Sequence, residues 1–214
     1  MIGRRMLMGG LAVAPFGSLQ AALPVPPDDR LIFSIIRKDD KIGEHTLTFT
    51  RTGNGLTVDV AVDIVVGFGP IAFFRYKHRA TEQWLGGQVV SIEAETNDDG
   101  TPRQMNGQRN DSGLVVQGSK AARYVAPAKS LPGTHWNRAM LDAPFINTED
   151  GRLMSPTVTL AGSVRIPEGG RSVMAQRFQL RGDADLDTFY DPTPSWAGLR
   201  FTARDGSEIT YLRV

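Results

Sequence analysis

The sequence contains no cysteine among its 214 residues. This absence excludes disulfides, cysteine-ligated zinc, iron–sulfur clusters, thiol nucleophiles and a lipid-modified N-terminal cysteine. An excess of charge of either sign is also lacking, because 24 Lys and Arg face 23 Asp and Glu. With 22% charged residues, the composition indicates neither a disordered tail nor a nucleic-acid-binding arm. We therefore expect a folded domain without a nucleic-acid partner.

Long hydrophobic runs are absent too, and the one apolar segment is short. Arg4 and Arg5 precede an apolar stretch at residues 6–14, and Ala21-Ala22 offers small residues for cleavage. This is the pattern of an export signal, and a membrane span would need roughly 20 apolar residues. We predict a signal peptide over 1–22 and a linker over 23–30. The protein is then periplasmic or secreted, with no transmembrane anchor after signal removal.

The paired arginines resemble a twin-arginine signal, and the general secretory route is the alternative. Both arginines of the predicted signal and none of the acidic residues leave on cleavage, so the remaining chain has a net charge of −1.

Alternation of apolar and polar residues dominates the rest of the chain. Its clearest example has apolar side chains at every second position, namely Val58, Val60, Val62, Ile64 and Val66. Short runs of this kind recur between glycine-rich and aspartate-rich turns, which is typical of antiparallel strands. We predict a single all-β domain over 31–214, an antiparallel meander that forms a strongly curved sheet, half-barrel or barrel.

One segment interrupts the strand pattern. Residues 121–151 contain three prolines and few alternating positions, and we predict a loop or short-helix insert there. Its best helical stretch is 137–142, where Asn137 can cap the start and Pro144 ends it.

The hairpin over residues 71–96 carries the strongest cluster of chemical side chains. A two-residue turn at Gly86-Gly87 would gather His78, Glu82 and Glu93 on one face, a candidate hydrolase site. A shift of one residue would instead place Arg79 opposite Glu93 or Glu95, which makes a solvated charged surface.

Other signs of catalysis are weak. The sequence contains no Gly-x-Ser-x-Gly motif, phosphate-binding loop or dinucleotide fingerprint, and only three histidines. We expect no metal and no cofactor. Aromatic and histidine side chains beside the predicted loops are the candidate lining of an apolar ligand pocket: Tyr76, Trp84, His135, Trp136, Tyr190 and Trp196.

Several short motifs together resemble an uncharacterised family of secreted proteobacterial proteins, a domain of unknown function. They are Ile42-Gly43-Glu44-His45, Glu82-x-Trp84, Thr96-Asn97-Asp98-Asp99-Gly100, His135-Trp136-Asn137, and Gly182 followed by Asp185-Leu-Asp187 and Tyr190-Asp191. The family covers nearly the whole mature chain. In topology the layout is also similar to the periplasmic lipoprotein carriers of the Lol pathway. That similarity implies a half-barrel around an apolar ligand.

The sequence therefore favours a periplasmic, non-catalytic binding or carrier protein with an apolar pocket for a lipid-like or hydrophobic ligand. Two alternatives stay open, namely a hydrolase that uses the hairpin over 71–96 and a structural component of an envelope assembly. The ligand, the oligomeric state and the closure of the barrel are left undetermined.

Overall fold

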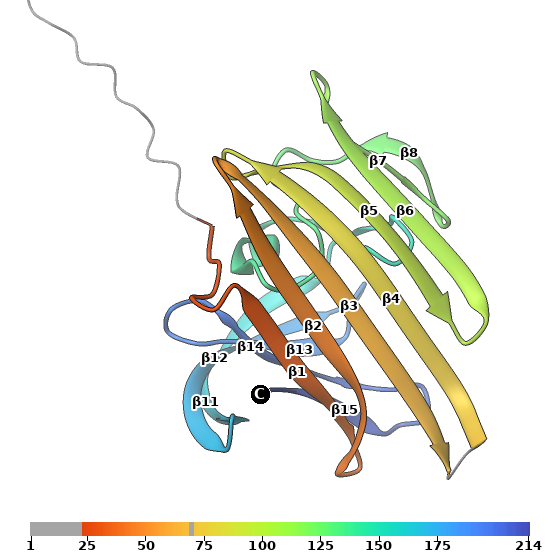
Figure 1. The fold of residues 1–214 in the computed structure, drawn as a ribbon, viewed down its shortest axis with the longest axis vertical. Coiled ribbons are helices and arrows are strands. Elements are labelled where there is room, and N and C mark those ends of the chain that lie inside the picture. Colours follow the sequence, from red (N-terminus) through yellow and green to blue (C-terminus); the bar gives the residue numbers. More distant parts are fainter. Residues whose placement is uncertain (1–22, 69–70) are drawn as a thin grey trace, which may run out of the picture.

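A computed structural model describes residues 23–68 and 71–214, and thirteen strands of this part form one antiparallel sheet (Figure 1). The predicted signal peptide lies outside the described residues. The first half of the sheet contains β1 (Arg30–Arg37), β2 (Asp40–Thr52), β3 (Gly55–Phe68), β4 (Ile71–Leu85), β5 (Gln88–Asp98), β6 (Thr101–Asn110), β7 (Gly113–Gly118) and β8 (Ala121–Val125). The second half contains β11 (Thr157–Glu168), β12 (Arg171–Arg181), β13 (Leu186–Tyr190), β14 (Trp196–Thr202) and β15 (Glu208–Arg213).

The two halves join where the last strand pairs with the first. The strand order is β11-β12-β13-β14-β15-β1-β2-β3-β4-β5-β6-β7-β8, and every neighbouring pair is antiparallel. The sheet bends so strongly that β12–β14 lie behind β1 and β2 (Figure 1). The all-β curved sheet predicted from the alternation is confirmed. The sheet is open, with β8 and β11 as its edges.

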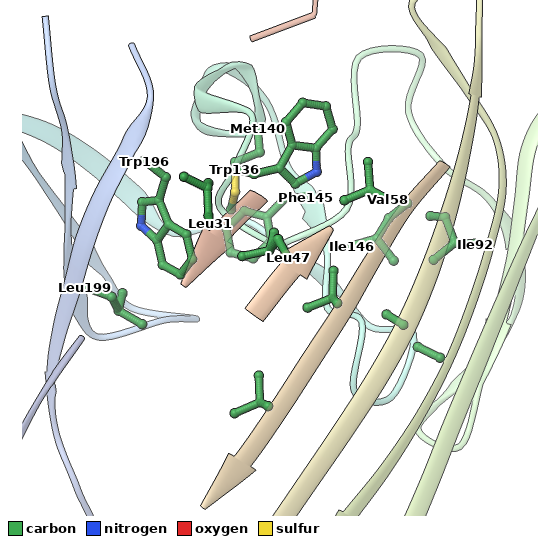
Figure 2. Packing of buried hydrophobic residues seen from close by; sticks show 14 of the residues in the cluster. Leu31, Leu47, Val58, Ile92, Trp136, Met140, Phe145, Ile146, Trp196 and Leu199 are labelled. Carbon is green, nitrogen blue, oxygen red and sulfur yellow. The ribbon is translucent and has the colours of Figure 1, made fainter. Parts of the chain in front are cut away.

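The core fills the concave side between the two halves. Figure 2 shows Leu47, Val58 and Ile92 from one half and Trp196 and Leu199 from the other around this space. The alternating pattern explains the arrangement, because side chains of a strand point to opposite faces in turn. Val58, Val60 and Val62 accordingly are at most 5% exposed.

The segment after β8 forms the insert, which begins at residue 126, a few residues later than its predicted start at about residue 121. Residues 121–125 are the edge strand β8, which pairs with β7 through Val115↔Val125 and Val116↔Tyr124. The insert proper spans residues 126–156. It holds one 3-10 helix, η1 (Arg138–Asp142), and a two-stranded sheet of β9 (Phe145–Ile146) and β10 (Leu153–Met154).

The insert is anchored by short local contacts. As predicted, the Asn137 side chain caps η1 by accepting a hydrogen bond from the Ala139 amide at 3.1 Å. Met140 and Trp136 are 1% exposed because they pack into the shared core on the concave side (Figure 2). Within residues 23–68 and 71–214, no helix has the length and apolar character needed to cross a membrane.

Candidate functional site

The register of the β4–β5 hairpin decides which predicted residues share a face. The pairing shifts between Gln83 and Trp84, so Thr81 faces Glu93 and His78 faces Thr96. A bulge of this kind inserts one extra residue and moves every later pair by one position. Glu93 therefore lies on the exposed face, so the register that groups it with His78 and Glu82 is wrong. The alternative register, in which Arg79 faces Glu95, is the one that the structure has.

Glu82 is the fully buried carboxylate of the concave face. It accepts hydrogen bonds from Thr134 Oγ1 at 2.5 Å, from Trp84 Nε1 at 2.8 Å and from Trp136 Nε1 at 3.1 Å. Burial raises the pKa of Glu82, while the hydrogen bonds from Thr134, Trp84 and Trp136 oppose that rise. Because two of its three donors belong to the insert, Glu82 fastens the insert to β4.

A cavity of about 810 Å³ lies next to this filled region. Its volume is within the range of about 300–1,000 Å³ that small-molecule sites occupy. One wall is the aliphatic row of β3, and the opposite wall comes from β14 and β15. The apolar residues of these two walls are Val60, Val62, Ile64, Val66, Leu199, Phe201, Ile209 and Tyr211.

Exposure along the cavity shows where it opens. Val60 is 3% and Val62 is 5% exposed, whereas Ile64 and Val66 are half-buried. Phe73, which also borders the cavity, is 67% exposed. The cavity is therefore closed near Val60 and opens toward the start of β4.

The three histidines of the chain all border this cavity. His45 on β2 pairs with Val62 on β3, and Val62 pairs with His78 on β4. His45 and His78 thus flank Val62 in one row across three strands, with backbones about 10 Å apart. His135 reaches the same cavity from the insert.

The hydrogen-bonding states of the histidines differ. His78 Nδ1 shares a hydrogen bond with Thr96 Oγ1 at 2.8 Å, and Nε2 contacts Thr148 Oγ1 at 3.4 Å. Both ring nitrogens of His45 and Nδ1 of His135 are buried, and none of the described residues hydrogen-bonds to them.

His135 is held in place by its surroundings. Its backbone has a φ of 66°, in the left-handed region that non-glycine residues rarely occupy. Tyr190 donates a hydrogen bond from its hydroxyl to the His135 carbonyl at 2.7 Å. The imidazole stacks on Trp196 with ring centres 5.4 Å apart. The strained residue is thus fixed by β13 and β14.

Burial keeps these imidazoles uncharged near neutral pH. It lowers the pKa of His45 to about 3, with smaller contributions from His135 and His78. It also lowers the pKa of His78 and of His135 to about 4. The described residues contain no group of three or more His, Asp or Glu side chains placed to hold a metal ion.

The predicted pocket residues divide into two groups. Tyr76 and His135 border the cavity, and the Tyr76 hydroxyl donates to Glu149 at 2.7 Å. The other four side chains are not among the residues that border the cavity, and each is at most 3% exposed: Trp84, Trp136, Tyr190 and Trp196. They pack among other core side chains, so their assignment to the pocket lining is wrong.

His45 and the β3 valines are among the lining residues that the sequence prediction missed. The length of the loop between β2 and β3 could have predicted the position of His45. A two-residue Gly53-Asn54 loop pairs Thr52 with Gly55, and counting back along both strands puts His45 opposite Val62.

The fold of this strongly curved antiparallel sheet is similar to that of a protein whose structure is known. A crystal structure of a beta-barrel-like protein of domain of unknown function DUF1849 from Brucella abortus is similar over 86% of this chain and 95% of that chain. The TM-score is 0.57 and the sequence identity 11%, a likeness of fold alone. No curated protein matches the sequence significantly. The chain belongs to the domain-of-unknown-function family DUF6134, which it matches over residues 33–214.

Proposed function

We propose that this chain is a non-catalytic binding or carrier protein of the bacterial periplasm that holds a lipid-like or hydrophobic ligand between the halves of its curved sheet. The observation that carries the proposal is the cavity of about 810 Å³ with an aliphatic wall on β3 and a mixed aliphatic and aromatic wall on β14 and β15. Burial of a ligand's apolar surface contributes about 25 cal/mol per Å², so walls of this kind favour an apolar ligand.

The alternative of a hydrolase has less support. Such an enzyme needs a general base within hydrogen-bond reach of its partner. His78 contacts the hydroxyls of Thr96 and Thr148 instead of a carboxylate, and Glu82 is occupied by three structural donors. Glu93 lies on the other face of the sheet.

A matched pair of substitutions tests the cavity. Ile64 borders the cavity, whereas its neighbour Val65 is 48% exposed on the other face. Ile64→Trp should fill the cavity and weaken binding of the neutral fluorescent dye N-phenyl-1-naphthylamine at least tenfold. Val65→Trp should leave the dissociation constant unchanged. Fluorescence titration gives both values.

Native mass spectrometry of the protein isolated from its own envelope provides the second measurement. A carrier should retain a lipid-sized adduct that Ile64→Trp removes. The proposal fails if the unmodified protein binds no dye and carries no adduct.

The periplasmic location rests on the N-terminal sequence and has its own test. Changing Arg4 and Arg5 together to lysine should stop export by the twin-arginine route, which fractionation would detect as precursor retained in the cytoplasm. Unchanged export would indicate the general secretory route, and cytoplasmic retention of the unmodified protein would contradict the location.

A further inference from the structure

The closed half of the cavity combines apolar walls with imidazoles that lack hydrogen-bond partners. His45 is 6% exposed and borders the cavity, yet neither of its ring nitrogens has a partner among the described residues. Buried polar groups in proteins are nearly always paired, and an unpaired one opposes folding. An unpaired imidazole that borders a cavity can therefore form its missing hydrogen bonds with a bound ligand.

His135, which reaches the cavity from the insert, supports the same interpretation. Its Nδ1 is also buried without a partner among the described residues. Nevertheless the fold holds this residue in a left-handed conformation through the Tyr190 hydroxyl and the Trp196 ring. Strained residues persist only where the surroundings determine them, and they cluster at binding sites.

We propose that His45 and His135 form the polar pole of the binding site and hydrogen-bond the uncharged head group of a single-chain amphiphile, a hydroxyl or carbonyl. The apolar chain then lies along Ile64 and Val66 toward the opening. This inference rests on the proposed binding function and specifies the ligand class and its orientation.

The electrostatics of the lining favour an uncharged head group over a phosphate. Both arginines of the lining already contact carboxylates, Arg37 with Asp205 and Arg204 with Asp98 at 3.7 Å. Two further carboxylates, Glu149 and Asp185, also border the cavity. The imidazoles are neutral because burial lowers their pKa values. A neutral imidazole offers one donor and one acceptor, which suits a hydroxyl or carbonyl.

A purely structural account of His45 predicts something different. Its ring meets Trp196 and Tyr211 edge to face, with interplanar angles of 67° and 78°. An imidazole N–H can interact weakly with an aromatic face. If this contact were its whole role, replacing His45 would not change the preference for a ligand head group.

Displacement of N-phenyl-1-naphthylamine by three C12 probes separates the possibilities. The probes are 1-dodecanol, n-dodecane and dodecyl phosphate, which differ only in the head group. We expect 1-dodecanol to bind at least tenfold tighter than either of the others. His45→Leu should remove that advantage and leave the n-dodecane affinity unchanged. The control Glu95→Gln, on the exposed face of β5, should change none of the affinities.

A second variant tests the same assignment if His45→Leu fails to fold. His135→Asn retains a residue type that tolerates a left-handed backbone but shortens the side chain, and it should also reduce the 1-dodecanol advantage at least tenfold. Equal affinities for 1-dodecanol and n-dodecane, or a preference that survives both variants, would overturn the head-group assignment alone. Tighter binding of dodecyl phosphate would also overturn it. Failure of all three probes and of the dye would instead contradict the binding function itself.

Discussion

The concave side of the sheet has a filled end and a hollow end, and each buries a polar side chain in a different way. At the filled end, Glu82 receives three hydrogen bonds from Thr134, Trp84 and Trp136. At the hollow end, His45 lies across the row from His78 with no partner for either ring nitrogen among the described residues. The hydrogen-bonded Glu82 holds the insert on the sheet, whereas the unpaired His45 remains able to hydrogen-bond with a ligand.

The two ends differ in how the cost of burying a polar group is offset. A buried polar group costs about 1–3 kcal/mol when it loses its partners. The insert contributes two of the three donors to Glu82, so that cost is avoided by folding alone. His45 has no such partner among the described residues. A ligand that hydrogen-bonds to its ring nitrogens would therefore remove this cost on binding.

The largest expected effect on stability comes from removing the buried carboxylate at the filled end. Glu82→Ala should lower the free energy of unfolding by about 4 kcal/mol, because Trp84, Trp136 and Thr134 lose their shared acceptor. The matched control Glu93→Ala, on the exposed face of the neighbouring strand, should change it by less than about 0.5 kcal/mol. Urea unfolding measures both. Similar losses in the two variants would contradict the distinction between the faces.

The second-largest expected effect is a loss of stability at acidic pH that arises from His45. Burial lowers the pKa of His45 from its ordinary value of 6.5 to about 3 in the folded protein. Below about pH 6.5 the unfolded chain therefore takes up a proton that the folded protein does not, and stability falls as the pH decreases toward the folded pKa. His45→Leu should lessen the loss of unfolding free energy between pH 7 and 4.5 by about 2 kcal/mol.

Urea unfolding at a series of pH values tests this expectation. Parallel stability curves for the unmodified protein and His45→Leu would show that His45 titrates equally in both states.

The smallest effect has an unusual sign. At pH 7 and without ligand, His45→Leu should raise the free energy of unfolding by about 1 kcal/mol, because it removes a buried unpaired polar group. Thermal unfolding of the ligand-free protein would register this as an increase in the melting temperature. A decrease would indicate that the aromatic contacts of His45 outweigh its unpaired nitrogens.

Local patterns predicted the sheet well but the site only in part. Alternation at Val58, Val60 and Val62 marked the inner face, and the Asn137 cap marked the start of η1. The grouping of Glu93 with His78 failed because it assumed a regular hairpin, whereas the pairing shifts by one residue at Gln83–Trp84. A bulge reflects packing across the sheet rather than a local residue preference.

The division of the aromatic residues could not be predicted for a related reason. Trp136 and Trp196 pack with residues from strands far away in the sequence, and only the curvature of the sheet brings them together. Whether an aromatic side chain fills a core or borders a cavity depends on the space left by those neighbours.

The open edges of the sheet affect the range of ligands that could fit. In a closed barrel the girth is set by strand number and stagger, so widening it requires strands to slip and ladder hydrogen bonds to break. Here the ladder ends at β8 on one side and at β11 on the other. The two walls can therefore spread by a change of curvature that leaves every pairing intact. Such mechanical compliance would let one cavity adapt to chains of different length and thickness.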